Sequence, residues 1–232
     1  MPNNTLAIRY IKTIDEINAL KNNKDKEINI HLIKRIENNY YDTEVNSTIA
    51  SATAIRELIA SQANYKSYVI DNNIKYLDIN NAYDKLLTII KSKFILKNDI
   101  SDFKNILGVK EGIENRIDNL IDQAINYSNL VNLTSTKRYT QNYLKRLFLN
   151  IILSIPEQSQ KIDYLRILGF NAKGEAYIKK LPKDIKTNII TTFKNSLDEN
   201  VKIELKATKL YSLLEGTNDL YKKEYQIPIR RK

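Results

Sequence analysis

The sequence lacks cysteine and has one histidine and only five glycines, none of them before Gly108. Without cysteine, disulfides, thiolate metal sites and cysteine nucleophiles are excluded. A single histidine, His31, excludes a histidine-rich metal site and a two-histidine catalytic pair. The scarcity of glycine excludes a GxGxxG dinucleotide fingerprint and a Walker A loop.

Long hydrophobic runs are also missing. The longest apolar stretch, residues 144–155, contains Lys145 and Arg146 and is too short to span a bilayer. No secretory signal opens the sequence, so we expect a cytoplasmic protein. Positive charge is abundant, because 37 Lys and Arg against 27 Asp and Glu give a net charge of +10. Such a basic chain is expected to meet a polyanion, with nucleic acid the first candidate, although lysine enrichment from an AT-rich genome weakens this argument.

The 232 residues are enough for one large domain or two small ones. Residues 6–21 follow the helical period, residues 27–36 alternate like a strand, and a polar loop over 37–46 leads to a short helix over 52–61. A helix, a strand, a loop and a helix make up only the carboxyl-terminal part of an α/β unit, because a stable parallel sheet needs more strands. We therefore expect residues 1–62 to be an α/β remnant, the second half of a Rossmann-like domain.

The remaining residues, 63–232, are expected to form a mainly α-helical domain. Its candidate helices are 80–93, 101–107, 110–126, 138–155 and 198–214. Two short β-rich stretches, 164–168 and 188–193, are candidates to pair into a small ribbon. The tail, residues 226–232, is expected to lie along the surface.

Two sets of residues in the first 62 suit a nucleotide. Asn3 and Asn4 precede the first predicted helix; they suit helix capping, and alternatively the recognition of a base or ribose by amide groups. Thr53 and Arg56, in the small and hydroxylated segment that begins at Ser51, share a helical face where the dipole favours phosphate. The alternative there is ordinary capping followed by an exposed arginine.

Arg35 ends the predicted strand, and ligands of open α/β sheets bind beyond the carboxyl ends of the strands. Taken alone, a strand-end arginine is more often simply solvated. His31 lies on the same strand, where a structural role is favoured over catalysis.

A basic cluster with one aromatic residue lies at the start of the helix predicted over 138–155. Cations hold phosphates and a tyrosine can stack on an unpaired base, so the cluster suits RNA. The alternative is a solvated helix face in a lysine-rich chain. The members of the cluster are Lys137, Arg138, Tyr139, Lys145 and Arg146, with Gln141 between them.

Several motifs, taken in order, resemble the tRNA(Met) cytidine acetate ligase family, which is nucleotidyltransferase-like. The segment 51–56 is shared by many nucleotidyltransferases, whereas its combination with 137–140 and 168–170 is considerably more specific. The resemblance covers nearly the whole chain. The motifs are PNNTL at 2–6, KRI at 34–36 with Tyr40 and Asp42, IASATAIR at 49–56, GVKEGIENR at 108–116, TKRYT at 136–140 and YLRILGF at 164–170.

The resemblance implies an ATP-dependent ligase. Such an enzyme activates acetate as acetyl-adenylate, releases pyrophosphate, and passes the acetyl group to N4 of the wobble cytidine of elongator tRNA(Met). By motif position, ATP with Mg²⁺ would be contacted by Asn3, Asn4, Arg35, Ser51, Thr53 and Arg56. The tRNA would be contacted by Lys137, Arg138, Tyr139, Lys145 and Arg146.

The sequence also departs from the family pattern. Members begin with a strand and a histidine motif that grips the triphosphate, and this sequence has no such motif. Ala7 stands where the family usually has glycine, and residues 37–39 and Tyr41 differ from its Gly-rich, His-containing stretch. We therefore expect a carboxyl-terminal portion that is inactive alone: the product of a truncated or split gene, of a frameshift or of a misplaced start codon. For a split gene, a separate chain would supply the missing half. The alternatives are a non-catalytic RNA-binding module and a degenerate product without activity.

Overall fold

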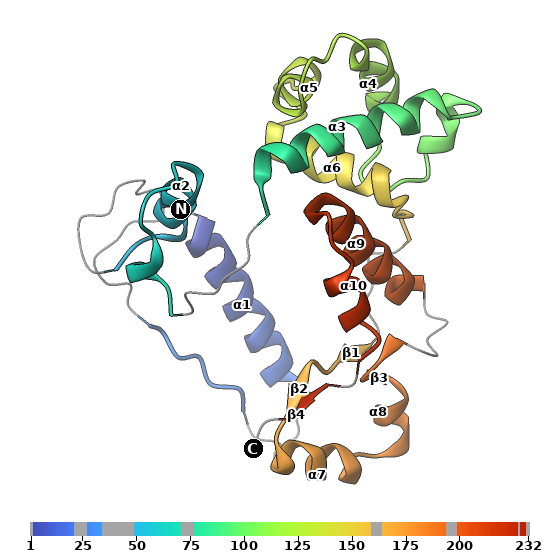
Figure 1. The fold of residues 1–232 in the computed structure, drawn as a ribbon. Helices are drawn as coiled ribbons and strands as arrows, with labels where there is room; N and C mark the ends of the chain where they lie inside the picture. The colour runs from blue at the N-terminus through green and yellow to red at the C-terminus, as the bar shows by residue number, and fades with distance from the viewer. Residues whose placement is uncertain are drawn as a thin grey trace. The chain divides into compact units, whose positions relative to one another are not determined.

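The computed structural model of the chain separates into two compact units, residues 1–75 and 76–232 (Figure 1). Each unit is described by itself. The structure describes residues 2–20, 27–33, 49–70, 77–158, 164–193, 199–226 and 228–230.

Two α-helices dominate the described part of the first unit: α1 (Pro2–Ala19) and α2 (Ala52–Ala60). A single 3-10 turn, η1, follows at Lys66–Tyr68. The helix predicted over 6–21 is confirmed, but it begins earlier, at Pro2, because proline is well tolerated in a first helical turn. Asn3 and Asn4 therefore lie inside the first turn of α1, and their predicted position ahead of the helix is wrong.

The strand predicted over 27–36 is not formed in its described part. Residues 27–33 have no regular secondary structure and are exposed. The backbone of Ile28 bonds to a side chain instead of a strand: its N–H donates to Asn18 Oδ1 at 2.9 Å, and Asn18 Nδ2 donates to its carbonyl at 3.0 Å. Alternating hydrophobicity makes a strand only where a partner strand accepts the pairing. Residues 34–36 and the loop predicted over 37–46 lie outside the described residues.

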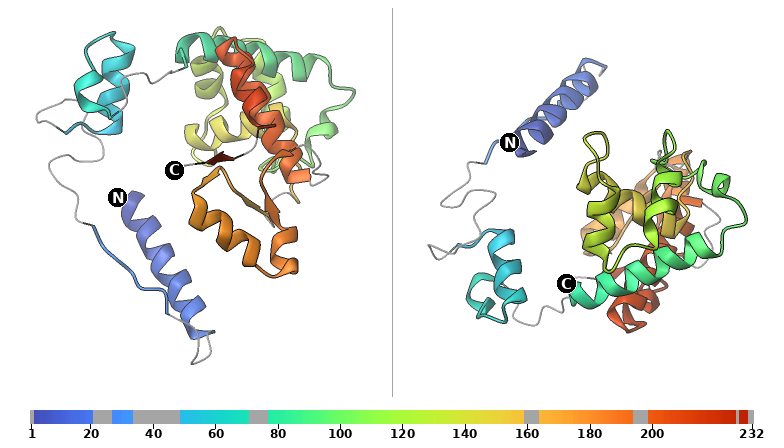
Figure 2. Two further views of the ribbon diagram at one scale, coloured as in Figure 1. Left: turned by 60° about the horizontal axis from the view of Figure 1, so that its bottom comes forward. Right: turned by 90° about the horizontal axis from the view of Figure 1, so that it is seen from above.

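The second unit is built on a helical core. Helices α3 (Ile79–Ile95), α5 (Tyr127–Thr134) and α6 (Gln141–Leu153) pack against one another. Helix α9 (Glu199–Glu215) packs on α3 and α6, and α4 (Ile113–Ile121) packs on α5. Figure 2 shows the same grouping of α3 to α6 from two further directions. None of the helices within the described ranges is both long and apolar enough to cross a membrane.

Helix α6 confirms the helix predicted over 138–155, somewhat shortened at both ends. Its predicted apolar stripe faces the core, with Ile155 half-buried beyond the end of the helix. This stripe places the polar face of the first turns of α6, and the basic residues near them, toward solvent. The buried members of the stripe are Leu144, Leu147, Phe148, Ile151 and Ile152.

Two predicted helices are shorter than expected. The segment 101–107 forms only one 3-10 turn, η2 (Ile100–Phe103), and the segment 110–126 contains α4 alone. Gly112 explains the late start of α4, because its φ of 77° is left-handed and interrupts a helix at that position. Helix α5 was not predicted as a separate element; it begins where the side chain of Asn126 accepts a bond from the N–H of Asn129.

Short strands complete the unit. β1 (Leu165–Arg166) pairs in parallel with β3 (Ile189–Ile190), which confirms the predicted ribbon. β2 (Gly169–Phe170) pairs in parallel with β4 (Ile229–Arg230), so the tail adds a strand where only a surface segment was predicted. A Cβ on Gly169 would lie 3.0 Å from the carbonyl oxygen of Ile229, which explains the glycine in this pair. Three unpredicted helices are α7 (Ala172–Lys180), α8 (Lys183–Thr187) and α10 (Asp219–Lys223).

Tyr127 gives this core a pH dependence. Its side chain is 3% exposed, and its ring stacks on that of Tyr83 with 4.8 Å between the centroids. Burial raises the pKa of the Tyr127 phenol to about 12, and the neighbouring Tyr83 adds to the shift. The raised pKa means that stability present below the ordinary pKa of 10.0 is lost as the pH rises toward 12.

We expect the free energy of unfolding to fall by about 2 kcal/mol through this group between about pH 10 and about pH 12, since one pKa unit corresponds to about 1.4 kcal/mol and Tyr127 is only half ionised at its folded pKa. The variant Tyr127→Phe has no such proton to lose. Urea unfolding of the two proteins across this range isolates the effect. A difference in stability between them that does not change with pH would contradict the assignment.

Candidate functional site

The predicted phosphate site is the N-terminus of α2. Ser51 is buried and caps the helix, its Oγ accepting from the N–H of Ala54 at 3.0 Å. Thr53 is half-buried and Arg56 is exposed, one turn apart on the same helix. The local geometry therefore has the hydroxyl, the guanidinium and the dipole end that an anion needs.

Of the other residues predicted to contact ATP, Asn4 alone has a described side chain. Asn4 is exposed in the first turn of α1, while Arg35 and the side chain of Asn3 lie outside the described residues. In the ranges that the structure describes, no group of three or more His, Asp and Glu side chains is placed to hold a metal ion. The ATP site and its Mg²⁺ accordingly stay predictions.

The predicted RNA-binding cluster lies against a loop from another part of the chain. Residues 108–112 connect η2 to α4, and two tyrosines from the start of α6 bond to them. Tyr139 Oη donates to the carbonyl of Lys110 at 2.7 Å, and Tyr143 Oη donates to the carbonyl of Gly108. The two rings are tilted against each other, with 5.5 Å between their centroids. The 108–112 loop is thus fixed to the first turn of α6.

Arg138 makes the third link to this loop. Its guanidinium pairs with the carboxylate of Glu111, and its Cζ lies 5.9 Å from the ring centroid of Tyr139. Both partners of the ion pair are well exposed, and such pairs contribute about 0–1 kcal/mol. A phosphate oxygen could therefore replace the Glu111 carboxylate on Arg138 at small cost.

The remaining cations of the cluster are exposed. Lys137, Lys145 and Arg146 form no ion pair with any residue in the described part of the chain. Burial raises the pKa of the Tyr143 phenol, Tyr139 adds to this, and the positive charge of Arg146 opposes it. Arg146 lies three residues after Tyr143 on α6, so the two side chains are neighbours on the helix surface.

Tyr139 has a role that its sequence position did not reveal. It is half-buried, its hydroxyl is bonded to Lys110, and its backbone N–H donates to Thr136 Oγ1 at 2.9 Å. The ring holds the 108–112 loop in place. Stacking of Tyr139 on an RNA base stays a prediction.

Sequence reasoning missed Tyr143 and Glu111 as parts of this surface, because their partners are 35 and 27 residues away. Arg116, in the motif 108–116, also proves to be structural: it donates to the carbonyls of Thr134 at 3.0 Å and Leu133 at 2.9 Å and so caps α5. For the pair of Glu111 and Arg138, one signal was present in the sequence, since both residues belong to motifs of the same family.

Comparisons with known proteins support these motifs. A model of the HIGH nucleotidyl transferase family matches residues 1–226. The tRNA(Met) cytidine acetate ligase of Staphylococcus saprophyticus is 31% identical over 225 residues, which cover 93% of this chain and 56% of that protein. The protein of the same name from Listeria monocytogenes serotype 4b (strain CLIP80459) is 32% identical over 241 residues, covering 98% of this chain and 58% of its own length. The chain thus spans little more than half the length of these curated relatives.

Solved structures agree with the sequence matches. Apo TmcAL of Thermotoga maritima (form I) superposes with a TM-score of 0.68 and 25% identity, over 88% of this chain and 56% of that one. The form bound with alpha-thio ATP has a TM-score of 0.57 and 24% identity over 78% of this chain and 52% of that one, which supports the fold alone. The chain has a nucleotidyltransferase-like fold and belongs to the HIGH nucleotidyl transferase family, and the relatives described above are named tRNA(Met) cytidine acetate ligases.

Proposed function

We propose that this chain acts in tRNA modification, as part of an ATP-dependent ligase that forms acetyl-adenylate and acetylates N4 of the wobble cytidine of elongator tRNA(Met). Its relatives bear the name of that ligase. The observation that carries the proposal is the basic surface around Arg138, which joins two family motifs, 108–116 and 136–140, through direct side-chain contacts.

In this proposal the cations of the surface meet tRNA phosphates. Arg138 would exchange Glu111 for a phosphate, and Lys137, Lys145 and Arg146 would add further contacts from the polar face of α6. The hydrogen bonds from the two tyrosines to the 108–112 loop hold the first turn of α6 in place before RNA arrives. Binding RNA therefore costs less conformational entropy. Each phosphate contact releases counterions, which makes the affinity depend on salt.

Two single substitutions around one ion pair test this surface. Arg138→Glu is expected to weaken tRNA(Met) binding by about 10- to 100-fold, since it removes a charged hydrogen bond worth roughly 1.5–3 kcal/mol. Glu111→Gln is expected to tighten binding, because it releases Arg138 and removes a negative charge. Filter binding at low salt measures both.

The matched control is Lys183→Glu, which reverses an exposed charge at the start of α8. It should weaken binding much less than Arg138→Glu. Equal losses for these two variants would reduce the proposal to diffuse charge attraction.

We further propose that ATP binds at the N-terminus of α2, where Thr53 and Arg56 face the phosphates and Ser51 shapes the helix start. Asn3, Asn4 and Arg35 would complete the contacts, and Mg²⁺ would arrive with the nucleotide. Adenylate formation relies on positioning and on neutralising phosphate charge, which these groups suit. Acetate is the second substrate.

Two finer hypotheses remain within this proposal. One holds that the chain is inactive alone and works with a separate chain; the other holds that it is a non-catalytic RNA-binding module. Purified protein given labelled acetate and ATP separates them from the active ligase. Acetyl-adenylate and pyrophosphate release indicate an active ligase, whereas tRNA binding without either favours the finer hypotheses.

A further inference from the structure

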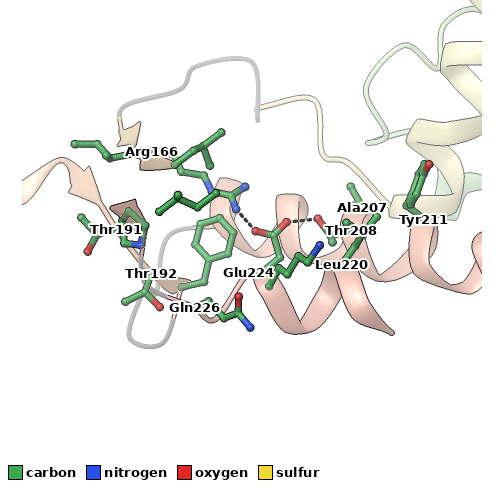
Figure 3. A pocket seen from close by; sticks show the side chains of 15 residues that line it. Arg166, Thr191, Thr192, Ala207, Thr208, Tyr211, Leu220, Glu224 and Gln226 are labelled. Carbon is green, nitrogen blue, oxygen red and sulfur yellow. Dashed lines mark hydrogen bonds and ion pairs between the residues drawn. The ribbon is translucent and has the colours of Figure 1, made fainter. Parts of the chain in front are cut away.

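A cavity of about 630 Å³ lies in the second unit, between β1, β3, α9, α10 and β4 (Figure 3). None of the functions proposed above uses it. Most of its wall is apolar, with Leu168, Leu220 and Ile229 among the lining residues. Its volume is in the range of about 300–1,000 Å³ that small-molecule sites occupy. Threonine, tyrosine and glutamine side chains add polar groups to the wall, and its charged members are Arg166, Lys223 and Glu224.

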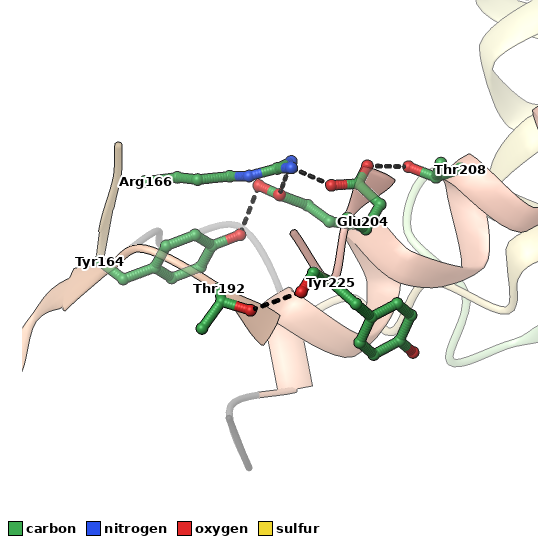
Figure 4. Close-up of polar contacts among 7 residues, drawn as sticks. Tyr164, Arg166, Thr192, Glu204, Thr208 and Tyr225 are labelled. Atoms are coloured by element: carbon green, nitrogen blue, oxygen red, sulfur yellow. Dashed lines mark hydrogen bonds and ion pairs between the residues drawn. The ribbon is translucent and has the colours of Figure 1, made fainter. Parts of the chain in front are cut away.

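Arg166 is held rigidly in this wall by two carboxylates (Figure 4). Its NH1 bonds Glu204 Oε2 at 3.1 Å, and its NH2 pairs with Glu224. Tyr164 Oη donates to Glu204 Oε1 at 2.5 Å, and Thr208 Oγ1 donates to Glu224 Oε1 at 2.6 Å. The guanidinium also lies over a ring, with Cζ 4.3 Å from the centroid of Phe193.

The charges of this network do not suit a phosphate inside the cavity. Two carboxylates surround one guanidinium, so the three groups together carry one excess negative charge, which disfavours a further anion beside them. Glu224 lines the cavity and only 11% of its side chain is exposed. A carboxylate has about four acceptor positions, and two of those on Glu224 are used, so it can accept further bonds.

The rim of the cavity has the opposite character. Lys223 lines it, is exposed, and forms no ion pair with a described residue. A ligand that matches the whole cavity would have an apolar planar body against the apolar walls. It would have hydrogen-bond donors at its edge for the Glu224 carboxylate, and a phosphate at its outer end for Lys223. A nucleotide with its base inserted has this chemistry.

We propose that this cavity receives one unstacked base of the bound RNA and favours a base with an amino group, such as cytosine, over uracil. The inference rests on the proposed function, because it assumes that the chain binds RNA. The amino group of cytosine donates to a carboxylate, whereas uracil presents a carbonyl oxygen at the same ring position. Glu224 is the residue that reads this difference, and Lys223 contacts the phosphate.

The experiment uses the full chain with the substitution Tyr211→Trp. The sequence contains no tryptophan, and Tyr211 lines the cavity, so the new indole reports on the cavity alone. Hexamers of cytidylate and of uridylate, each with a fluorescent end label, are the probes. Anisotropy of the label measures total binding, and quenching of the tryptophan measures occupancy of the cavity.

We expect the cytidylate hexamer to bind about tenfold more tightly than the uridylate hexamer, and to quench the tryptophan. Glu224→Gln should bring the two affinities close to equal. Glu204→Gln is the matched control, because Glu204 bonds the same arginine but does not line the cavity. It should keep the preference.

A further variant leaves the ion pairs of Arg166 intact, so that a loss of cavity binding cannot be attributed to misfolding. Ala207→Leu fills the cavity from α9 and should abolish quenching while leaving most of the total binding. Equal binding of the two hexamers without quenching would overturn this inference and leave RNA binding standing. Equal quenching by both would overturn the base preference. Absence of binding by either hexamer, in a chain that still binds tRNA(Met), would overturn the inference and leave the proposed function standing. Absence of tRNA(Met) binding as well would overturn the proposed function.

Discussion

Phe148→Ala is expected to destabilise the second unit by about 3–5 kcal/mol, the range for truncating a buried aromatic side chain. Phe148 is 0% exposed and lies on α6, the helix that packs against α3, α5 and α9. Its ring meets that of Tyr127 edge to face, with 6.1 Å between the centroids. Neighbours from three helices cannot all move into the space that the ring would leave, so a cavity would remain.

Urea unfolding followed by circular dichroism measures this loss. The control is Leu149→Ala, the next residue on α6, whose side chain is 38% exposed. We expect it to cost less than about 1 kcal/mol, since surface positions contribute little. Similar losses at the two positions would mean that α6 does not bury the face assigned to it.

The second large effect concerns RNA. Replacing Lys137, Arg138 and Arg146 together by alanine is expected to weaken tRNA(Met) binding about a hundredfold or more at low salt, because three charged contacts are removed at once. The matched control removes the same charge from α7 and α8 through Lys173, Lys180 and Lys183, which are exposed and form no ion pair with described residues. It should weaken binding only several-fold.

The helices of this protein were largely predictable from sequence because their information is local. The stripe from Leu144 to Ile152 repeats at helical spacing, and burial of that stripe places α6. Ser51 likewise predicted the start of α2, since capping needs only the next three residues.

The strand over 27–33 could not be decided in the same way. Its alternating pattern gives the period of a strand but supplies no partner, and Asn18 satisfies the backbone of Ile28 instead. The alternating hydrophobic pattern therefore indicated an extended strand, but no strand in the described residues pairs with this segment.

The sites depended on contacts between distant segments. Tyr143 reaches Gly108 across 35 residues, and Arg166 reaches Glu224 across 58. No local pattern predicts such pairs. The sequence predicted Arg138 as a cation near the start of a helix. Only the fold shows that Arg138 pairs with Glu111, which would compete with an RNA phosphate for it.

The salt dependence of tRNA(Met) binding tests the central claim most directly, namely that the surface around Arg138 is a defined RNA site. Affinities of the unsubstituted chain and of the two triple variants are measured by filter binding over a range of salt concentrations. Each phosphate contact contributes about 0.7–0.9 to the slope of log affinity against log salt, so the Lys137, Arg138 and Arg146 variant should lose about 2–3 units. The Lys173, Lys180 and Lys183 variant should keep the slope of the unsubstituted chain. Equal slopes for the two triple variants would contradict the claim.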